Sequence, residues 1–255
     1  MPDSAPREAA RRPVVLVFAS HYLPAFRAGG PIRTLANMVG ALREEVDFRI
    51  FTRDHDFGRP EPLAGVPPRE WCDVGGARVF YGSRQDRGGR AIVTLLREVR
   101  PDVVYLNSFF DPTFSILPLA LRRAGLVERG VIWVIAPRGE FSEGALAIKA
   151  EKKRAFLRVA SALGLHRGLV WQASSEFEAG RIRSKMGAIA QVIEVAPNLT
   201  APVEPLAVAS PNRPGEPLAA CFIGRVSAMK NLRFAIEVVS RVSRPVRFDI
   251  YGPIE

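Results

Sequence analysis

From residue 13 onward the chain alternates short apolar runs with segments of helical periodicity. Strands buried on both faces are nearly continuous apolar runs, so this order predicts an α/β protein with a doubly wound parallel sheet. The helix expected at residues 31–43 is the clearest, since Ile32, Leu35 and Val39 recur on one of its faces. The expected strands span residues 14–19, 48–52, 78–81, 103–106, 131–136, 169–173 and 192–196. The other expected helices span residues 90–99, 114–124, 143–161 and 176–186.

A proline-rich stretch divides the chain, with six prolines at positions 197, 202, 205, 211, 214 and 217. Such segments favour an extended connector, so the stretch predicts a domain boundary. We expect a flexible tail at residues 1–12, a first domain at 13–200, a linker at 201–216 and a second domain that starts at 217. Residues 217–255 hold only a strand, a helix and a strand, below the ~40 residues needed for independent folding. We therefore expect this second domain to be incomplete.

Composition is typical of a soluble globular protein, because 47% of the residues are hydrophobic and no apolar run reaches the ~18 residues of a membrane-spanning helix. Residues 14–19 follow two arginines, as the core of a signal peptide would. No small-residue cleavage pattern comes after them, which favours a first core strand. Cys72 and Cys221 are too far apart for a metal or redox motif, which indicates a reducing cytoplasm.

The formal net charge of +10 comes from 36 basic against 26 acidic residues, and most of the basic residues are arginine. This balance indicates phosphate or lipid-headgroup partners, although compositional bias produces it as well. Nucleic-acid binding is disfavoured because the arginines are scattered along the chain. The segment 149–158 is a basic amphipathic helix, for which peripheral contact with an anionic membrane and a plain solvated face both stay open. Its cations are Lys149, Lys152, Lys153, Arg154 and Arg158.

Two cations meet near the C-terminus, where a strand is expected to lead into a helix. The apolar run 219–223 predicts a buried strand, Gly224 and Arg225 its exit, and Lys230 the opening of the helix. Anions bind at such turns in open α/β sheets. A nucleoside diphosphate carries about two to three negative charges, which two cations and a helix end of about +0.5 would largely neutralise without a metal. We predict a diphosphate site at Arg225 and Lys230, with two solvated surface charges as the alternative.

Glycines and polar side chains also follow strands of the first domain. Gly29 and Gly30 precede the helix at 31–43, where glycine lets a phosphate or sugar oxygen approach the backbone. His21 follows the first strand, and Arg138 and Glu140 follow the strand at 131–136, at the edge where ligands collect in such sheets. The alternatives are a hydrogen-bonded loop histidine and a surface ion pair. Three further polar residues are expected to cap the loop after residue 106: Asn107, Ser108 and Asp111.

A series of segments resembles the family 4 glycosyltransferases of the GT-B type, which contain two Rossmann-like domains. The most specific is Gly224-Arg225 followed by Lys230-Asn231. The segments that carry the resemblance, in the family's order, are residues 29–31, 136–141, 174–178, 197–199, 222–225 with 230–231, and 251–253.

The resemblance implies a retaining glycosyltransferase of the cytoplasm that moves a sugar from a nucleotide-sugar donor to a polysaccharide or lipid-linked acceptor. It implies that Arg225 and Lys230 bind the donor diphosphate with Gly30 on the opposite wall, and that neither a metal nor another cofactor takes part. The catalytic residues stay unassigned. The family's two glutamates spaced eight apart are missing before Glu255, so we expect no transfer by this chain alone.

Two other functions fit parts of the sequence. A non-catalytic module that binds a glycan or a partner protein would need only the first domain. A nicotinamide-dependent Rossmann oxidoreductase is disfavoured, because no spaced-glycine fingerprint follows residues 14–19 and no acidic residue ends the strand at 49–53.

Overall fold

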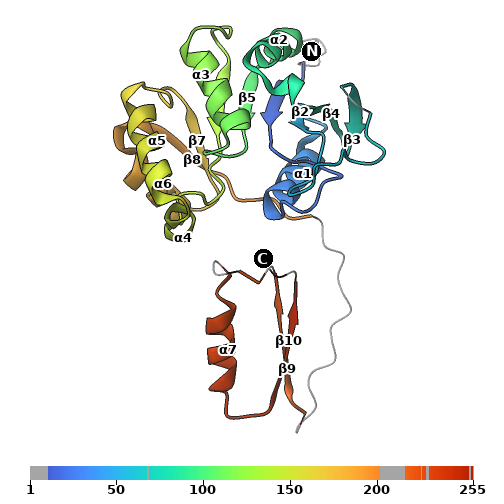
Figure 1. The fold of residues 1–255 in the computed structure, drawn as a ribbon, viewed down its shortest axis with the longest axis vertical. Helices are drawn as coiled ribbons and strands as arrows, with labels where there is room; N and C mark the ends of the chain where they lie inside the picture. Colours follow the sequence, from blue (N-terminus) through green and yellow to red (C-terminus); the bar gives the residue numbers. More distant parts are fainter. Residues whose placement is uncertain are drawn as a thin grey trace, which may run out of the picture. The chain divides into compact units, whose positions relative to one another are not determined.

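The computed structural model describes residues 11–67, 69–201, 216–224, 226–227, 230–252 and 254. The chain divides into two compact units, Met1–Ala201 and Pro202–Glu255, each with strands and helices (Figure 1). Most of the predicted tail at 1–12 and of the predicted linker at 201–216 lies outside the described residues.

An eight-stranded sheet forms the first unit, in the order β3-β4-β2-β1-β5-β6-β7-β8. Neighbouring strands are parallel, except that β3 pairs antiparallel with β4 at one edge. The predicted α/β fold with a mainly parallel sheet is therefore confirmed. The strands are β1 (Val14–Phe18), β2 (Asp47–Arg53), β3 (Trp71–Val74), β4 (Ala77–Gly82), β5 (Val103–Leu106), β6 (Ile132–Ile135), β7 (Val170–Ala173) and β8 (Val192–Val195).

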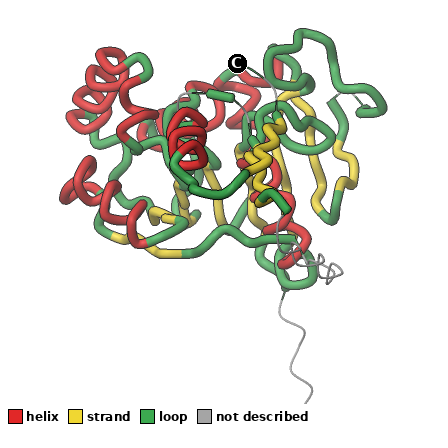
Figure 2. Tube along the Cα trace, turned by 90° about the horizontal axis from the view of Figure 1, so that it is seen from below, coloured by secondary structure: helices red, strands yellow, loops and turns green. Residues whose placement is uncertain are grey.

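Helices flank this sheet, as the view coloured by secondary structure shows (Figure 2). Strand side chains alternate between the two faces, which gives two core layers. Val17 of β1 shares one buried cluster with Leu35 of α1, whereas Leu16 belongs to a second cluster with Ile92 of α2 and Ile182 of α6. The helices are α1 (Gly30–Leu42), α2 (Gly89–Val99), α3 (Leu117–Arg123), α4 (Glu143–Ala147), α5 (Ala150–Ala162) and α6 (Glu176–Met186).

The single helix predicted at residues 143–161 is wrong, because α4 and α5 are separate. Lys149 between them adopts a left-handed backbone with φ 55° and ψ 42°. The Lys153 ammonium donates to the carbonyl oxygen of Ala145 at 2.6 Å and lies 4.8 Å from the centre of the Phe110 ring. A side chain thus satisfies a carbonyl at the end of α4, which stabilises the break.

The helix predicted at residues 114–124 also starts differently. A π-helical turn, Pro112–Ile116, precedes α3, and the Asp111 carboxylate accepts hydrogen bonds from the backbone N–H groups of Thr113 and Phe114. The expected loop-capping role of Asp111 is thereby confirmed.

An aromatic cluster in the core surrounds a histidine. His166 is 1% exposed and stacks on Phe109, with ring centres 4.6 Å apart. Trp171, Phe156 and Phe109 all lie around its ring. Neither ring nitrogen has a hydrogen-bond partner among the described residues. Burial lowers the pKa of His166 from 6.5 to about 4, because the charged ring would lose its hydration.

We expect His166→Phe to reduce the acid sensitivity of the fold. The unfolded chain takes up a proton at His166 below pH 6.5, whereas the folded protein does so only near pH 4. Stability is therefore lost as the pH falls through this window, by about 2 kcal/mol at pH 5. Urea titrations at pH 7.5 and pH 5 measure how much unfolding free energy each protein loses on acidification. This loss should be about 2 kcal/mol smaller for His166→Phe than for the wild type. An unchanged difference would contradict the neutral, buried state of His166.

The second unit contains β9 (Leu218–Ile223), α7 (Leu232–Ser240) and β10 (Val246–Tyr251), with β10 parallel to β9. The predicted strand at 219–223 is confirmed by β9, but its predicted burial is wrong, because alternate residues of β9 are exposed and only β10 pairs with it in the described part of this unit. The helix does not open at Lys230 as predicted, because Asn231 has a left-handed backbone with φ 49° and α7 begins after it. Large apolar side chains of this unit stay exposed, among them Ile223, Phe234 and Tyr251.

Candidate functional site

The carboxyl ends of the parallel strands define one edge of the first unit. β1 lies between β2 and β5 in the sheet. After β1 the chain adds β2 and β4 on one side, and it then crosses to the other side of β1 to add β5, β6, β7 and β8. In doubly wound sheets this change of direction opens the place where ligands bind. The loops after β1 and β6 carry the predicted site residues His21, Gly29, Arg138 and Glu140, and Gly30 opens α1. The sheet thus brings these five residues to one edge.

The start of α1 is an open stretch of backbone. Gly29 precedes the helix with φ 78° and ψ −136°, and no side chain of the described residues caps this helix end. Apart from the chain neighbours and the backbone of α1 itself, no heavy atom of the described residues lies within 4 Å of where a Cβ would stand on Gly29 or on Gly30. A ligand atom can therefore approach this helix end closely, as the prediction for Gly30 requires.

His21 is half-buried beside the start of this loop. Its Nδ1 lies 3.1 Å from the Ser20 hydroxyl, and its ring meets the Phe57 ring edge-on with centres 5.9 Å apart. Burial first and the Arg53 charge second lower the pKa of His21 from 6.5 to about 4. The ring is therefore neutral near pH 7, suited to hydrogen bonding with a hydroxyl rather than to binding an anion.

Arg138 ties together three strand ends. Its Nε donates to the Asn107 amide oxygen at 2.8 Å, one terminal nitrogen to the Asn198 amide oxygen at 2.6 Å, and the other to the Tyr105 hydroxyl at 2.6 Å. The Tyr105 hydroxyl in turn donates to Gln172 of β7. The guanidinium thus links the loops after β5, β6 and β8, and its contact with a ligand stays a prediction.

Glu140 anchors the loop that follows β5. Its carboxylate accepts hydrogen bonds from the backbone N–H of Phe109, from the N–H of Phe110 at 3.2 Å and from the Ser108 hydroxyl at 3.0 Å. Burial raises the pKa of Glu140 above its ordinary value, and these hydrogen bonds oppose the rise. The Glu140 carboxylate thus binds backbone and hydroxyl groups of the loop after β5. Among the described residues it forms no ion pair with Arg138.

Two buried carboxylates at this edge were not predicted from the sequence. Glu178, 7% exposed, accepts from the Gly139 N–H at 2.6 Å, the Ser174 N–H at 2.7 Å and the Ser174 hydroxyl at 2.6 Å. Asp56 accepts from three backbone N–H groups of the loops after β1 and β2. Glu178 follows Ser175 at the spacing of a capping box, a signal that the sequence did carry. No local pattern marks Asp56.

Arg53 was also missed, although it ends β2 at the same edge. Its guanidinium lies 3.2 Å from the Asp111 carboxylate and 5.1 Å from the centre of the Phe114 ring. The buried Nε of Arg53 has no partner among the residues that the structure describes. Arg53 therefore links the loops after β2 and β5 through its ion pair with Asp111.

The predicted diphosphate residues belong to the second unit. Lys230 is exposed, and its backbone N–H donates to the Ser227 carbonyl oxygen at 3.0 Å. Arg225 lies outside the described residues. The roles of Arg225 and Lys230 stay predictions.

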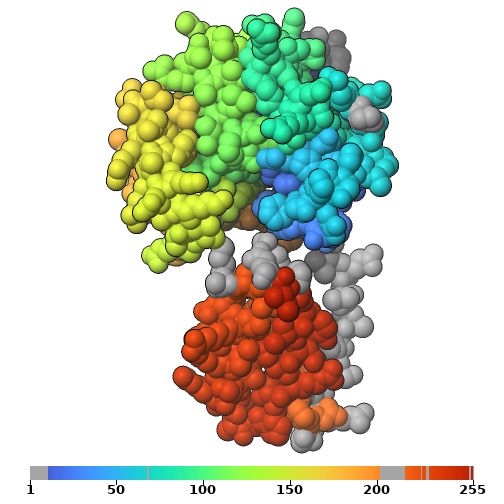
Figure 3. Space-filling model, in the orientation of Figure 1, coloured from blue at the N-terminus to red at the C-terminus, as the bar shows by residue number. Residues whose placement is uncertain are grey.

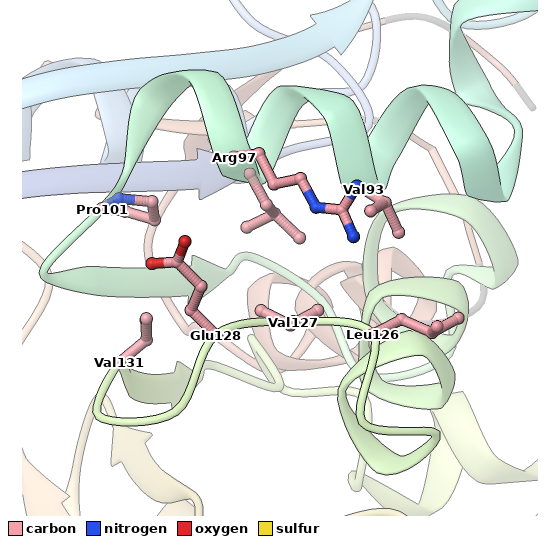
Figure 4. Close-up of a pocket in the computed structure, with 8 residues that line it drawn as sticks. Val93, Arg97, Pro101, Leu126, Val127, Glu128 and Val131 are labelled. Carbon is pink, nitrogen blue, oxygen red and sulfur yellow. The ribbon is translucent and has the colours of Figure 1, made fainter.

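A small hollow at the opposite edge of the first unit does not contain the predicted residues. It lies between the end of α2 and the loop before β6, with Arg97 and Glu128 at its rim (Figure 4). The described residues contain no cluster of three or more His, Cys, Asp or Glu side chains arranged to bind a metal ion. Within the same residues, no helix has the length and apolar character to cross a bilayer.

Comparison with known proteins identifies the family. The chain matches the family described as "Glycosyl transferase 4-like domain" over residues 29–199. Its structure is similar to the apo form of the lipopolysaccharide outer core galactosyltransferase WaaB, with a TM-score of 0.51 and 14% sequence identity. That similarity covers 93% of this chain but 60% of that chain, so the chain spans less than two thirds of the galactosyltransferase's length. No curated protein matches the chain in sequence.

The structural match agrees with the predicted GT-B type of fold. The family match extends over more than half of the chain and includes Gly29, Gly30, Arg138 and Glu140. The predicted resemblance is confirmed, and the chain belongs to the family of glycosyltransferases with a glycosyl transferase 4-like domain.

Proposed function

We propose that this protein transfers a sugar from a nucleotide-sugar donor to a polysaccharide or lipid-linked acceptor in the cytoplasm, with retention of anomeric configuration. Residues 13–200 form the acceptor side, and residues 217–255 contribute to the donor side. The observation that carries the proposal is the family match over residues 29–199, which includes the open start of α1 and most of the polar loops at the carboxyl edge.

The donor diphosphate is assigned to Arg225, Lys230 and Gly30. A departing nucleoside diphosphate gathers negative charge, and fixed cations and free backbone N–H groups stabilise that charge as it develops. The exposed ammonium of Lys230 and the open backbone at Gly30 have the required chemistry. We propose that these groups act without a metal ion.

A transfer assay with the full-length gene product tests this function. UDP-, GDP- and ADP-sugars, UDP-galactose among them, are incubated in EDTA with soluble glycans and with polyprenyl-diphosphate-linked sugars. We expect one donor to release its nucleoside diphosphate only when an acceptor is present, and NMR to find the donor's anomeric configuration in the product. Absence of release from every donor would refute the proposal. Glycan binding without any release would instead support the non-catalytic binding module.

We also propose that α5 contacts an anionic membrane, which would bring the enzyme to a lipid-linked acceptor. Val159 of this helix and Leu163, which caps its C-terminus, are both exposed, and Lys152 lies on the same face two turns before Val159. The exposed Arg158 adds a further cation beside Val159. In the space-filling view the α5 segment, yellow, lies on the outer surface of the first unit (Figure 3). Apolar side chains flanked by cations are typical of helices that lie in a membrane surface.

We expect the double change Lys152→Glu and Arg158→Glu to weaken binding to vesicles containing anionic lipid at least tenfold, because each cation near such a surface contributes ~1 kcal/mol. Co-sedimentation measures the binding. Arg90→Glu with Arg97→Glu on α2 makes the same change in net charge away from α5 and should bind like the wild type. Equal loss in both double variants would mean that net charge alone, and not the α5 surface, drives binding.

A further inference from the structure

Two phenylalanine side chains project into solvent at the carboxyl edge. Phe26, in the loop after β1, is 75% exposed, and Phe57, in the loop after β2, is 56% exposed. Exposed large apolar side chains at a binding edge indicate a contact surface when the backbone holds them in place.

A buried carboxylate holds both loops. Asp56 is 6% exposed, and its oxygens accept from the N–H groups of Phe26 at 3.2 Å, Arg27 at 3.2 Å and Phe57 at 2.7 Å. Charge-assisted hydrogen bonds of this kind are about twice as strong as neutral ones. One side chain thus holds the backbone N–H groups of Phe26 and Phe57 at the same carboxylate and fixes the two neighbouring loops that carry the rings.

Polar side chains lie near the two phenylalanines in space or in the chain. The His21 ring meets Phe57 edge-on, with ring centres 5.9 Å apart. Two residues before Phe57 in the chain, the His55 Nδ1 lies 2.7 Å from the Asp54 carboxylate. Arg27 follows Phe26 and is exposed. The surface therefore combines two aromatic faces with hydrogen-bond donors and acceptors at its rim.

We propose that Phe26 and Phe57 form a platform on which a pyranose ring of the acceptor stacks, with His21 and the Asp54–His55 pair placed to bind its hydroxyls. This inference rests on the proposed transferase function and names the acceptor subsite. The electron-rich face of an aromatic ring attracts the C–H groups on the apolar face of a sugar, while the sugar's equatorial hydroxyls point outward. A lipid chain or a membrane would leave the polar rim without partners, which costs free energy.

Saturation-transfer NMR on the 255-residue chain tests the platform without any transfer reaction. The probes are methyl glucoside, methyl galactoside, methyl mannoside and methyl N-acetylglucosaminide. We expect at least one probe to bind, with saturation strongest at the ring C–H groups of one face. Phe26→Ala and Phe57→Ala should each weaken that binding about tenfold, whereas Phe57→Tyr should keep it. Phe234 on α7 of the second unit, 60% exposed, is the control, and Phe234→Ala should bind like the wild type.

Two outcomes would overturn the platform: no binding of any probe to the wild type, or binding by the Phe26→Ala and Phe57→Ala variants that equals that of the wild type. Both side chains are exposed, so loss of folding does not confuse the result, and circular dichroism checks it. If the probes bind through the phenylalanines but the full-length gene product releases no nucleoside diphosphate, the transferase proposal fails and the platform stands.

Discussion

Lys230→Ala is expected to lower sugar transfer by the full-length gene product at least 100-fold. The leaving diphosphate carries about two to three negative charges, and loss of one group that stabilises such charge typically costs 10²–10³ in kcat. Lys230 is exposed, so its removal leaves the fold intact. Initial rates of nucleoside diphosphate release at saturating donor measure the effect. Arg225→Ala should act in the same direction.

Arg247→Ala is the control for this prediction. Arg247 is an exposed cation near the start of β10 that lies 3.0 Å from the Asp249 carboxylate. A general change in charge would slow both variants, whereas loss of a specific diphosphate contact would slow Lys230→Ala and leave Arg247→Ala unchanged. Transfer that is unchanged in Lys230→Ala would remove that lysine from the donor site.

Glu178→Ala is expected to lower the free energy of unfolding by about 3–5 kcal/mol, since removal of one partner leaves buried polar groups uncompensated. Three donors lose their acceptor at once: the N–H of Gly139 and both the N–H and the hydroxyl of Ser174. For a chain of this size the melting temperature should fall by roughly 10 °C. Differential scanning calorimetry measures the change.

Glu176→Ala provides the comparison within the same helix, because the Glu176 side chain is 80% exposed and lies 3.9 Å from Arg183. It should cost less than about 1 kcal/mol. Glu178→Gln keeps one carbonyl oxygen and should fall between the two alanine variants. Equal melting temperatures for Glu178→Ala and Glu176→Ala would show that the buried carboxylate does not hold the Gly139 loop.

Hydrophobic periodicity was sufficient to predict most of the first unit. Ile32, Leu35 and Val39 are buried on α1 as their spacing predicts, because a helix with one apolar face is stabilised mainly by packing that face against the core. The antiparallel strand β3 was missed. Gly75 and Gly76, with φ 63° and 96°, connect it to β4, and a Gly-Gly pair between two apolar runs is a hairpin signal that was present in the sequence.

Local patterns failed where long-range contacts decide the backbone. The break between α4 and α5 is stabilised by the hydrogen bond from Lys153 to the Ala145 carbonyl oxygen. The helical periodicity of this segment continues through the break and therefore did not predict it. The same holds at the site. Asp56 was not predicted because two of its partners, the N–H groups of Phe26 and Arg27, lie in another loop. Glu178 carried a local capping-box signal, but its bond to the Gly139 N–H could not be predicted from local sequence. Sequence patterns placed His21, Gly30 and Arg138 at the correct edge, but not the carboxylates that organise it.

The most direct test of donor binding is an NMR titration of the ¹⁵N-labelled full-length gene product with UDP, GDP and ADP. The amide resonances of Gly30 and Lys230 report on the two places proposed to contact the diphosphate. We predict that one of these nucleotides shifts both resonances with a common, saturable dependence on concentration, while inorganic sulfate at the same ionic strength does not. Nucleotide-induced shifts confined to other residues, with Gly30 and Lys230 unmoved, would contradict the proposed donor site.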